Sequence, residues 1–496
     1  MRMNLHELAF AAHQRGDLAQ AEQLYTKALA IDPDAFGSRH RLGLLHAQQG
    51  RFEDALAQFG RALTIDPDSP EALLNYGNVL KKLRRHNEAL AAYTRVITLR
   101  PDFAGAWYNR GNCHNEMKRP AEAVADYDRV LAANPGHEGA LVNRGNALHA
   151  LRREDEALDS FDRALAIHPH NAETWKNRGI TLRVLNRFAD ALESFDRALA
   201  LQPGNPELMN CRGHTLCESG RVAEAFEVFR QSAARGIGQG TPNGPGTPPQ
   251  KLRHDAEQQA YLGTRARVDG PLFLEGGARL PGPAINPANA EKVTREWNAS
   301  NPQLVVIDNL LTPEALAELR RFCLCSNVWR HTYNDGYVGA FPEHGFAAPL
   351  LAQIADEFAA TFPAIFAGHP LGYLWAFKYD SKMRGINIHA DVAAVNVNFW
   401  ITPDDANLDP NHGGLVVWDK MAPLDWDFEA YNGDVKKTRA FLRESRAQSV
   451  TVPYRANRAV VFDSDLFHET DVISFKDGYE NRRINVTLLY GRREKA

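Results

Sequence analysis

Three side chains in the C-terminal part of the sequence have the types and spacing of metal ligands. His389 and Asp391 are separated by a single residue, and His468 comes later in the chain, after a segment typical of a strand (residues 458–463). Two imidazoles and one carboxylate on one side of a metal leave three coordination positions open, which Fe(II) needs to hold a bidentate co-substrate together with dioxygen. In a strand, residues two apart share a face, so His389 and Asp391 would point the same way. A His-x-Asp pair alone is weak evidence, because the spacing arises by chance and a lone histidine in a strand is more often a hydrogen-bonded core residue. For the three residues together, the competing interpretation is a decayed, metal-free barrel.

A row of polar side chains near the C-terminus suggests a binding site for a ligand. Arg483, Asn485 and Thr487 alternate with apolar residues in a segment typical of a strand, so the three polar side chains occupy one face. Such a face requires a partner, and a guanidinium suits a carboxylate because its N–H groups bind both oxygens at once. Arg482 is the alternative to Arg483. We favour Arg483 because it lies four positions before Thr487 and would therefore share a strand face with it, whereas Arg482 would lie on the opposite face.

Another polar face lies close to the His-x-Asp pair. Asn396, Asn398 and Trp400 fall on the same face of a predicted strand. They either line the pocket, with Asn398 contributing to cofactor binding, or satisfy one another's hydrogen bonds. The sequence leaves both interpretations open.

The segments that carry these residues are predicted to be strands. Residues 304–311 form an apolar run typical of a buried strand, and Thr312 and Pro313 mark the start of a helix as N-cap and first helical residue. Beyond this helix, short segments rich in β-branched and aromatic residues are separated by turn residues; they are 375–380, 386–391, 394–402, 413–419, 449–453, 458–463 and 482–491. Many short strands in one block predict a sandwich or barrel, here of the jelly-roll type.

The order of these features resembles the Fe(II)/2-oxoglutarate-dependent dioxygenases, in particular their prolyl-hydroxylase-like branch, over about residues 303–492. In that family a strand tyrosine precedes the His-x-Asp pair, and a glycine pair, a distal histidine and a basic residue with threonine four positions later follow it. The matching residues here are Tyr379, His389, Asp391, Gly413, Gly414, His468, Arg483 and Thr487.

The resemblance implies a double-stranded β-helix (jelly-roll) domain with flanking helices. In it the two histidines and the aspartate would bind Fe(II) and act as the catalytic residues. Arg483 would bind the distal carboxylate of 2-oxoglutarate, assisted by Thr487 and the Tyr379 hydroxyl. The implied reaction is hydroxylation, with 2-oxoglutarate and O2 as co-substrates.

The N-terminal half is a repeat with a period of 34 residues. Prolines recur at that spacing, at Pro33, Pro67, Pro101, Pro135, Pro169 and Pro203. Glycines keep the same spacing, at Gly43, Gly77, Gly111, Gly145, Gly179 and Gly213. An alanine column followed four residues later by an aromatic ring also repeats, which predicts that the ring fills the space beside a closely approaching helix. The pattern resembles the tetratricopeptide repeat, a helix-turn-helix unit, over seven repeats between residues 3 and 236.

Asparagines and arginines also repeat at this period. The asparagines are Asn75, Asn109, Asn143 and Asn177, and the arginines are Arg110, Arg144, Arg178 and Arg212. Stacked repeats turn equal positions into a row, and an amide can donate to and accept from any peptide backbone. The asparagine row resembles the ladder of O-GlcNAc-transferase-like repeats, which implies peptide binding; a purely structural polar seam is equally compatible. For the arginines we favour ion pairs between helices, with acidic residues such as Asp126 or Glu122.

These patterns divide the chain into an all-α tetratricopeptide solenoid (residues 1–236), a linker with a short helix (237–302) and the dioxygenase-like domain (303–496). The linker assignment rests on the Gly- and Pro-rich stretch from Gly236 to Pro249, which cannot pack as a helix. A short polar helix is expected from Lys251 to Leu262.

Composition limits the classes of partner and location. The net charge of −4 gives no global attraction to nucleic acid or an anionic membrane. Five cysteines without a Cys-x-x-Cys pair argue against a disulfide framework or a zinc cluster. No apolar run reaches membrane-spanning length. We expect a soluble cytoplasmic protein whose oligomeric state the sequence does not determine.

Three functions compete at this stage. The first is an Fe(II)/2-oxoglutarate hydroxylase whose solenoid recruits a protein or peptide substrate. The second is an oxygenase that acts on a small molecule, with the repeats serving assembly. The third is a non-catalytic adaptor for protein–protein interaction. The sequence identifies neither the substrate nor the hydroxylated atom.

Overall fold

The computed structural model describes residues 4–236, 247–333, 336–381 and 385–493. The chain divides into two compact units, Met1–Arg187 and Phe188–Ala496. Residues 237–246 of the predicted linker lie outside the described residues.

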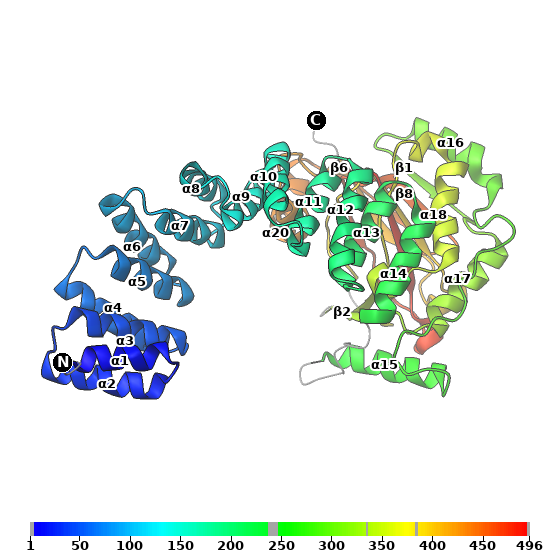
Figure 1. The fold of residues 1–496 in the computed structure, drawn as a ribbon. Helices are drawn as coiled ribbons and strands as arrows, with labels where there is room; N and C mark the ends of the chain where they lie inside the picture. The colour runs from blue at the N-terminus through cyan, green and yellow to red at the C-terminus, as the bar shows by residue number, and fades with distance from the viewer. Residues whose placement is uncertain (1–3, 237–246, 334–335, 382–384, 494–496) are drawn as a thin grey trace. The chain divides into compact units, whose positions relative to one another are not determined.

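The first unit is a stack of antiparallel helix pairs (Figure 1). Its helices are α1 (Leu5–Gln14), α2 (Leu18–Ile31), α3 (Phe36–Gln48), α4 (Phe52–Ile65), α5 (Pro70–Lys82), α6 (His86–Leu99), α7 (Ala104–Glu116), α8 (Pro120–Ala133), α9 (Glu138–Ala150), α10 (Glu154–Ile167) and α11 (Ala172–Val184). The prolines of the 34-residue period lie in the turns that follow the second helix of each pair. The predicted helical repeat is therefore confirmed.

The glycine column marks the closest approach of the two helices within a repeat. A β-carbon on Gly145 would lie 2.6 Å from the ring of Phe161, and one on Gly77 would lie 2.7 Å from the ring of Tyr93. The aromatic ring of the second helix therefore occupies the space that a larger residue at the glycine position would need. This confirms the packing predicted from the repeat pattern.

The boundary between the two units falls before the last helices of the repeat pattern. These helices are α12 (Phe188–Leu201), α13 (Pro206–Glu218) and α14 (Val222–Gly236), and all three belong to the second unit. Here α13 packs on strand β4 (Leu371–Tyr379), and α14 packs on helix α18 (Pro349–Thr361). The buried residues Leu216, Phe226 and Phe229 share one apolar cluster with the β-rich part of the unit. The repeat pattern thus continues to residue 236, whereas the compact unit ends at residue 187.

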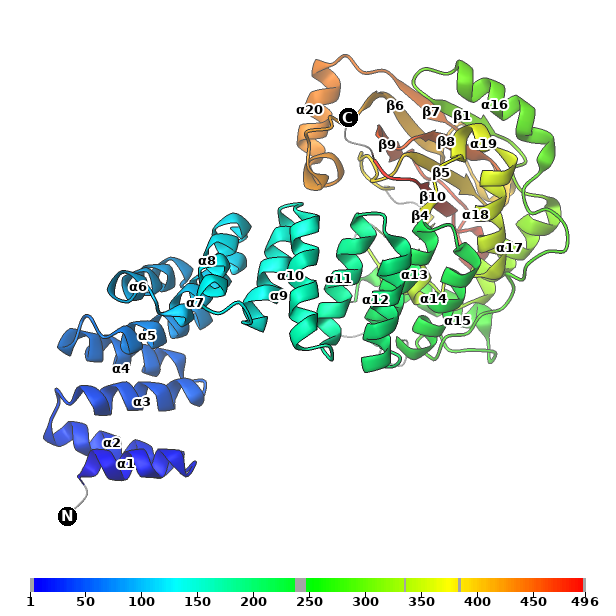
Figure 2. The ribbon, with the colours of Figure 1, turned by 45° about the horizontal axis from the view of Figure 1, so that its top comes forward.

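The remainder of the second unit contains helices and two antiparallel sheets (Figure 2). Its other helices are α15 (Pro249–Leu262), α16 (Ala290–Ala299), α17 (Pro313–Cys325), α19 (Pro363–Phe366) and α20 (Val435–Glu444), with short turns η2 (Pro287–Asn289), η3 (Pro342–His344), η4 (Asp404–Ala406), η5 (Glu429–Gly433) and η6 (Tyr479–Asn481). Its other strands are β1 (Leu304–Ile307), β2 (His331–Thr332), β3 (Tyr337–Ala340), β5 (Val395–Trp400), β6 (Leu415–Met421), β7 (Ser449–Val452), β8 (Ala459–Asp463), β9 (Leu466–Thr470) and β10 (Ile484–Tyr490).

The larger sheet has seven strands in the order β1-β8-β5-β10-β4-β3-β2, and the smaller has three in the order β7-β6-β9. Alternating residues of the central strand β10 face different environments. Val486 and Leu488 belong to the large cluster that also contains side chains of α17 and α18. A second cluster joins the other face of the large sheet to β6 of the small sheet, through residues such as Phe377 and Leu415. The two sheets therefore enclose a separate interior space.

Two local predictions differ from the structure. Residues 386–391 were expected to form a strand, but His389 makes only an isolated bridge to His468. His468 was expected to follow a strand, whereas it lies within a short strand of its own, β9. The helix expected at Thr312 is confirmed, because the Thr312 hydroxyl accepts from the Ala315 N–H at the start of α17.

Candidate metal centre

Two histidines and one aspartate converge between the sheets. The ligand atoms of His389, Asp391 and His468 all lie within 4.8 Å of one another. His389 Nε2 is 3.8 Å from Asp391 Oδ1, and His468 Nε2 is 3.4 Å from Asp391 Oδ2. The backbone joins the two histidines directly, because each N–H donates to the carbonyl of the other at 3.0 and 2.8 Å. Metal–ligand bonds of ~2.1 Å can span both side-chain separations, so the three groups fit one ion.

Hydrogen bonds to the backbone decide which imidazole nitrogen is available to a metal. His389 Nδ1 lies 2.8 Å from the Asn387 carbonyl oxygen, and His468 Nδ1 lies 3.0 Å from that of Leu466. A carbonyl oxygen only accepts, so Nδ1 carries the proton in both rings. Nε2 is then the unprotonated nitrogen, directed at Asp391. Burial lowers the pKa of His389 to about 4, with a further decrease from the neighbouring His468, so the ring is neutral at pH 7.

A chain of amides holds the carboxylate. Asn396 Nδ2 donates to Asp391 Oδ2 at 2.6 Å, and Asn398 Nδ2 donates to Asn396 Oδ1 at 2.6 Å. Asn398 Oδ1 in turn accepts from Asn485 Nδ2 and Thr487 Oγ1, both at 2.8 Å. The chain runs from the carboxylate across β5 to β10, so its members orient one another and Asp391. The polar face containing Asn396 and Asn398 therefore supports the carboxylate, and Asn398 also lines the cavity.

Arg483 is buried beside these ligands. Its side chain is 1 % exposed, and its Nε and Nη2 donate to the carbonyls of Gly413 and Gly414 at 2.7 and 3.1 Å. Its Nη1 is buried and has no hydrogen-bond partner among the described residues. The guanidinium stacks near the rings of Tyr379 and Trp400, at 4.8 and 5.5 Å from their centroids. Burial lowers the pKa of Arg483, which is the signature of a charge removed from water.

The two arginines left open by the sequence point to different places. Arg483 lines the same cavity as the histidines, together with Tyr379, Thr487 and Asn398. Arg482 instead donates from Nε to Glu257 Oε2 on α15 at 2.8 Å. Arg483, which the spacing to Thr487 favoured, is thus the arginine that lines the cavity.

The cavity has a volume of about 40 Å³ and is lined by both sheets. Aromatic residues Trp375 and Phe377 of β4 form one wall, and Ile386, Leu415 and Thr470 complete the lining. These five residues were missed by the sequence reasoning. The alternation of Trp375, Phe377 and Tyr379 at every second position of one strand would have identified the wall.

The asparagine row of the first unit is partly engaged in bonds between repeats. Asn143 Nδ2 donates to Asn112 Oδ1 at 2.8 Å, and Asn177 Nδ2 donates to Asn146 Oδ1 at 3.0 Å. The side chain of Asn109 has no hydrogen bond to another described residue. The amide oxygens of Asn143 and Asn177 take no part in these bonds.

Asn75 and the repeated arginines also contact neighbouring residues of the repeats. Asn75 Nδ2 lies 3.0 Å from His40 Nε2 of the preceding repeat. The arginine column forms ion pairs, as predicted: Arg110 with Asp126, Arg144 with Asp128, Arg178 with Asp162 and Arg212 with Asp196. The arginines are thus used within the protein, and the asparagines are the polar groups of this row that retain free hydrogen-bonding capacity.

Among the described residues, no helix combines the length and the apolar character needed to cross a membrane.

Comparison with known families identifies the repeats. Sequence models described as tetratricopeptide repeat match residues 4–35, 74–138, 116–172 and 172–205, and one described as TPR repeat matches residues 43–84. A comparison with curated proteins found no match to the chain.

Several solved structures are similar to parts of this chain. The crystal structure of MamA is 25 % identical, covers 35 % of this chain and 99 % of its own, and has a TM-score of 0.33. YrrB, described as a TPR protein with an unusual peptide-binding site, is 23 % identical, with 38 % and 97 % coverage and a TM-score of 0.35. A tetratricopeptide repeat protein from Parabacteroides merdae ATCC 43184 is 20 % identical, with 47 % and 92 % coverage and a TM-score of 0.38. Residues 4–35 and 43–205 of this chain therefore contain tetratricopeptide repeats.

Proposed function

We propose that the protein is an Fe(II)- and 2-oxoglutarate-dependent oxygenase that hydroxylates a protein or peptide recruited by its repeats. The observation that supports this most strongly is the placement of Arg483. A buried guanidinium with an unpartnered Nη1 lines the same cavity as two unprotonated Nε2 atoms and a carboxylate. An uncompensated buried charge is costly, so such a site is suited to an anionic ligand.

The residues present fit this cofactor pair. His389, Asp391 and His468 would hold Fe(II), and Arg483 would bind the carboxylate of 2-oxoglutarate that does not reach the metal. Thr487 and Tyr379 border the same cavity and offer hydroxyl groups. The two sheets around the cavity are then the halves of a double-stranded β-helix.

Bound Fe(II) with 2-oxoglutarate supplies the activation of dioxygen and the oxidation of a C–H bond. The protein's own residues prepare the site for this chemistry. The backbone carbonyls of Asn387 and Leu466 hold the imidazoles with Nε2 unprotonated. Asn396 fixes the orientation of Asp391, and Trp375 and Phe377 give the cavity an apolar wall.

Turnover by the full-length protein tests this proposal. After anaerobic loading with Fe(II) and admission of air, the wild-type protein should convert 2-oxoglutarate to succinate, and His389→Ala should abolish the conversion. His369→Ala serves as the matched control, because this histidine belongs to the same unit but does not line the cavity. Absence of turnover by fully metallated wild-type protein would leave a role in protein interaction only.

The proposal of a polypeptide substrate rests on the asparagines of the first unit. Asn109 is unengaged, and the oxygens of Asn143 and Asn177 remain available, so the row can donate to and accept from an extended backbone. YrrB, a repeat protein of similar architecture, is described as having a peptide-binding site.

Capture of polypeptides by full-length protein tests this second part. A His389→Ala variant incubated with cell extract should retain polypeptides, and adding Asn109→Ala with Asn143→Ala should reduce that retention. Substituting an engaged position of the same unit, Arg144→Ala, is the control for general damage to the repeats. Equal retention by the asparagine variant would favour a small-molecule substrate.

A further inference from the structure

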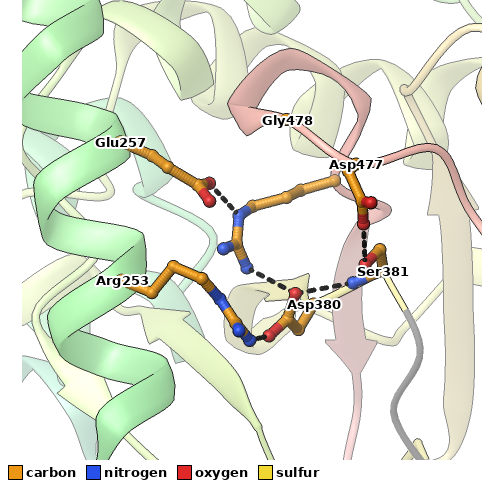
Figure 3. Close-up of a pocket in the computed structure, with 7 residues that line it drawn as sticks. Arg253, Glu257, Asp380, Ser381, Asp477 and Gly478 are labelled. Atoms are coloured by element: carbon orange, nitrogen blue, oxygen red, sulfur yellow. Dashed lines mark hydrogen bonds and ion pairs between the residues drawn. The ribbon is translucent and has the colours of Figure 1, made fainter.

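A series of charged side chains lines a pocket of the second unit that is separate from the metal cavity (Figure 3). The pocket has a volume of about 540 Å³ and is lined by Arg253, Glu257, Asp380, Ser381, Asp477, Gly478 and Arg482. Arg253 and Glu257 come from α15, Asp380 follows the last residue of β4, and Arg482 stands just before β10. The pocket therefore joins a helix that follows the repeats to the ends of two central strands.

The charges form one connected series. Arg253 pairs with Asp380 Oδ2, Arg482 Nη1 lies 3.5 Å from Asp380 Oδ1, and Arg482 Nε donates to Glu257 Oε2 at 2.8 Å. Asp380 and Arg482 are 7 % and 4 % exposed. Since both charges are buried, each depends on its partners to offset desolvation.

These two buried charges are the immediate neighbours of two residues that line the metal cavity. Asp380 follows Tyr379, and Arg482 precedes Arg483. The backbone links the pairs across the strands, because the Tyr379 N–H donates to the Arg483 carbonyl at 2.9 Å. Asp380 and Arg482 lie just beyond the ends of β4 and β10, and each lines the charged pocket while its neighbour Tyr379 or Arg483 lines the metal cavity. Because adjacent side chains of extended backbone point in opposite directions, holding Asp380 and Arg482 on one side constrains Tyr379 and Arg483 on the other.

Helix α15 contacts the rest of the unit through both polar and apolar side chains. Its buried residues are Lys251, His254, Asp255, Gln258 and Leu262. Gln258 Nε2 donates to the Ser326 carbonyl at 2.9 Å, and Lys251 pairs with Asp255 within the helix. Leu262 is buried, and Tyr261 packs against the apolar cluster with its ring 5.1 Å from that of Tyr479. The ion pairs of Arg253 and Glu257 add to these contacts and connect the helix to Asp380 and Arg482.

We propose that Arg253, Glu257, Asp380 and Arg482 form a positioning network that couples the docking of α15 to the placement of Arg483 and Tyr379, and thereby to the affinity for 2-oxoglutarate. The expected effect on 2-oxoglutarate affinity rests on the proposed function. The effect of α15 on the placement of Tyr379 and Arg483 does not depend on the identity of the ligand. Arg253 and Glu257 act through other residues and touch no part of the metal cavity.

The test removes both α15 charges without changing the net charge, as Arg253→Gln with Glu257→Gln in the full-length protein. Two quantities are measured: hydrogen exchange of peptides containing the Tyr379 amide, and binding of 2-oxoglutarate to Mn(II)-loaded protein by calorimetry. We expect faster exchange at Tyr379 and a dissociation constant raised about fivefold, with Mn(II) binding unchanged. The conservative variant Arg253→Lys with Glu257→Asp should return both quantities toward wild-type values.

A matched control removes another ion pair of the same unit, as Arg265→Gln with Glu275→Gln, whose side chains lie 3.0 Å apart. It should leave both quantities unchanged. Wild-type exchange at Tyr379 in the double variant, or faster exchange with unchanged 2-oxoglutarate affinity, would overturn the network. If the wild-type protein binds no 2-oxoglutarate at all, the proposed function fails, and the exchange measurement still decides whether α15 positions the strands.

Discussion

Arg483 is a cation enclosed by the protein without an ion-pair partner among the described residues. Two glycine carbonyls hold the guanidinium, and the rings of Tyr379 and Trp400 flank it. Neutral carbonyls fix its direction without neutralising its charge. This distinguishes Arg483 from Arg482, whose charge is balanced by Glu257 and Asp380.

Replacing Arg483 should therefore affect the ligand more than the metal. For Arg483→Met we expect 2-oxoglutarate affinity to fall by about 10- to 100-fold, because hydrogen bonds to charged groups contribute ~1.5–3 kcal/mol. Calorimetry on Mn(II)-loaded protein measures this, and Mn(II) affinity should not change. Arg458→Met is the control, since Arg458 pairs with Asp308 outside the cavity. An unchanged affinity for 2-oxoglutarate would contradict the role given to Arg483.

Lys378 is a second buried cation, on the opposite side of β4 from Tyr379. It is 0 % exposed, and its Nζ lies 3.7 and 4.7 Å from the ring centroids of Tyr479 and Trp329. Burial lowers its pKa well below the ordinary value for lysine. At pH values below the ordinary lysine pKa, this lysine is protonated in the unfolded chain, whereas the folded protein binds the same proton less tightly. Lys378 therefore makes the free energy of unfolding increase with pH.

The corresponding prediction concerns the pH dependence of stability. Lys378→Met should raise the unfolding free energy of the second unit at pH 7, and the difference from wild type should shrink as pH rises toward ~10. Urea unfolding followed by near-UV circular dichroism at several pH values measures this. Lys476→Met, at an exposed lysine, should show no such slope. A loss of stability at pH 7 would mean that contact with the two rings outweighs the cost of burial.

At the scale of elements, the helix pairs of the repeats depend on glycine for space. In an open helix, Gly→Ala is stabilising by ~1 kcal/mol because alanine favours the helical conformation. At Gly145 the added β-carbon would lie 2.6 Å from Phe161, so packing and propensity act in opposite directions.

We expect the cost of the close contact with Phe161 to exceed the gain in helix propensity. Gly145→Ala should destabilise the first unit by about 1–3 kcal/mol, as overpacked cores do, when unfolding is followed by far-UV circular dichroism. Gly60→Ala, also within a helix but with no neighbour closer than 4.0 Å, should be neutral or stabilising. Adding Phe161→Leu to Gly145→Ala should recover part of the loss. If both glycine variants stabilise the protein, the glycine column has no packing role.

At the scale of the whole molecule, the last helices of the repeat pattern form one core with the sheets. Phe226 and Phe229 of α14 belong to the same apolar cluster as Leu350 and Leu351 of α18. Arg230 also donates to the Ala347 carbonyl at 3.4 Å. Cutting the chain at residue 236 would expose this shared surface on both fragments.

The fragments should behave accordingly. Residues 188–496 should yield a soluble, monodisperse protein with a cooperative thermal transition, whereas residues 237–496 should aggregate or melt at a lower temperature because α12–α14 are missing. Size-exclusion chromatography and calorimetry compare the two. Residues 1–187, the fragment left by a cut after residue 187, are the matched control and should show a thermal transition of their own. Equal stability of the two C-terminal fragments would show that α12–α14 contribute little to the core.

Much of the architecture could be predicted because it follows from periodicity. A 34-residue period specified the helix pairs, and a two-residue alternation predicted that Arg483, Asn485 and Thr487 point the same way, as their shared cavity confirms. The His-x-Asp pair and the distant histidine were recognised as candidate ligands through the order of the surrounding motifs, which resembles that of a known family. Such patterns are local, so neighbouring residues suffice to reveal them.

Other features depend on contacts between segments distant in the sequence. The sequence could not show that His389 and His468 share a backbone bridge, or that Arg482 pairs with Glu257 across 225 residues. Nor did the unbroken repeat pattern indicate that its last helices share an apolar core with the sheets. Chain order alone determined which side chains could carry chemistry. Only the tertiary structure decided which of them meet, because burial and long-range pairing are set by the packing of whole elements and not by local spacing.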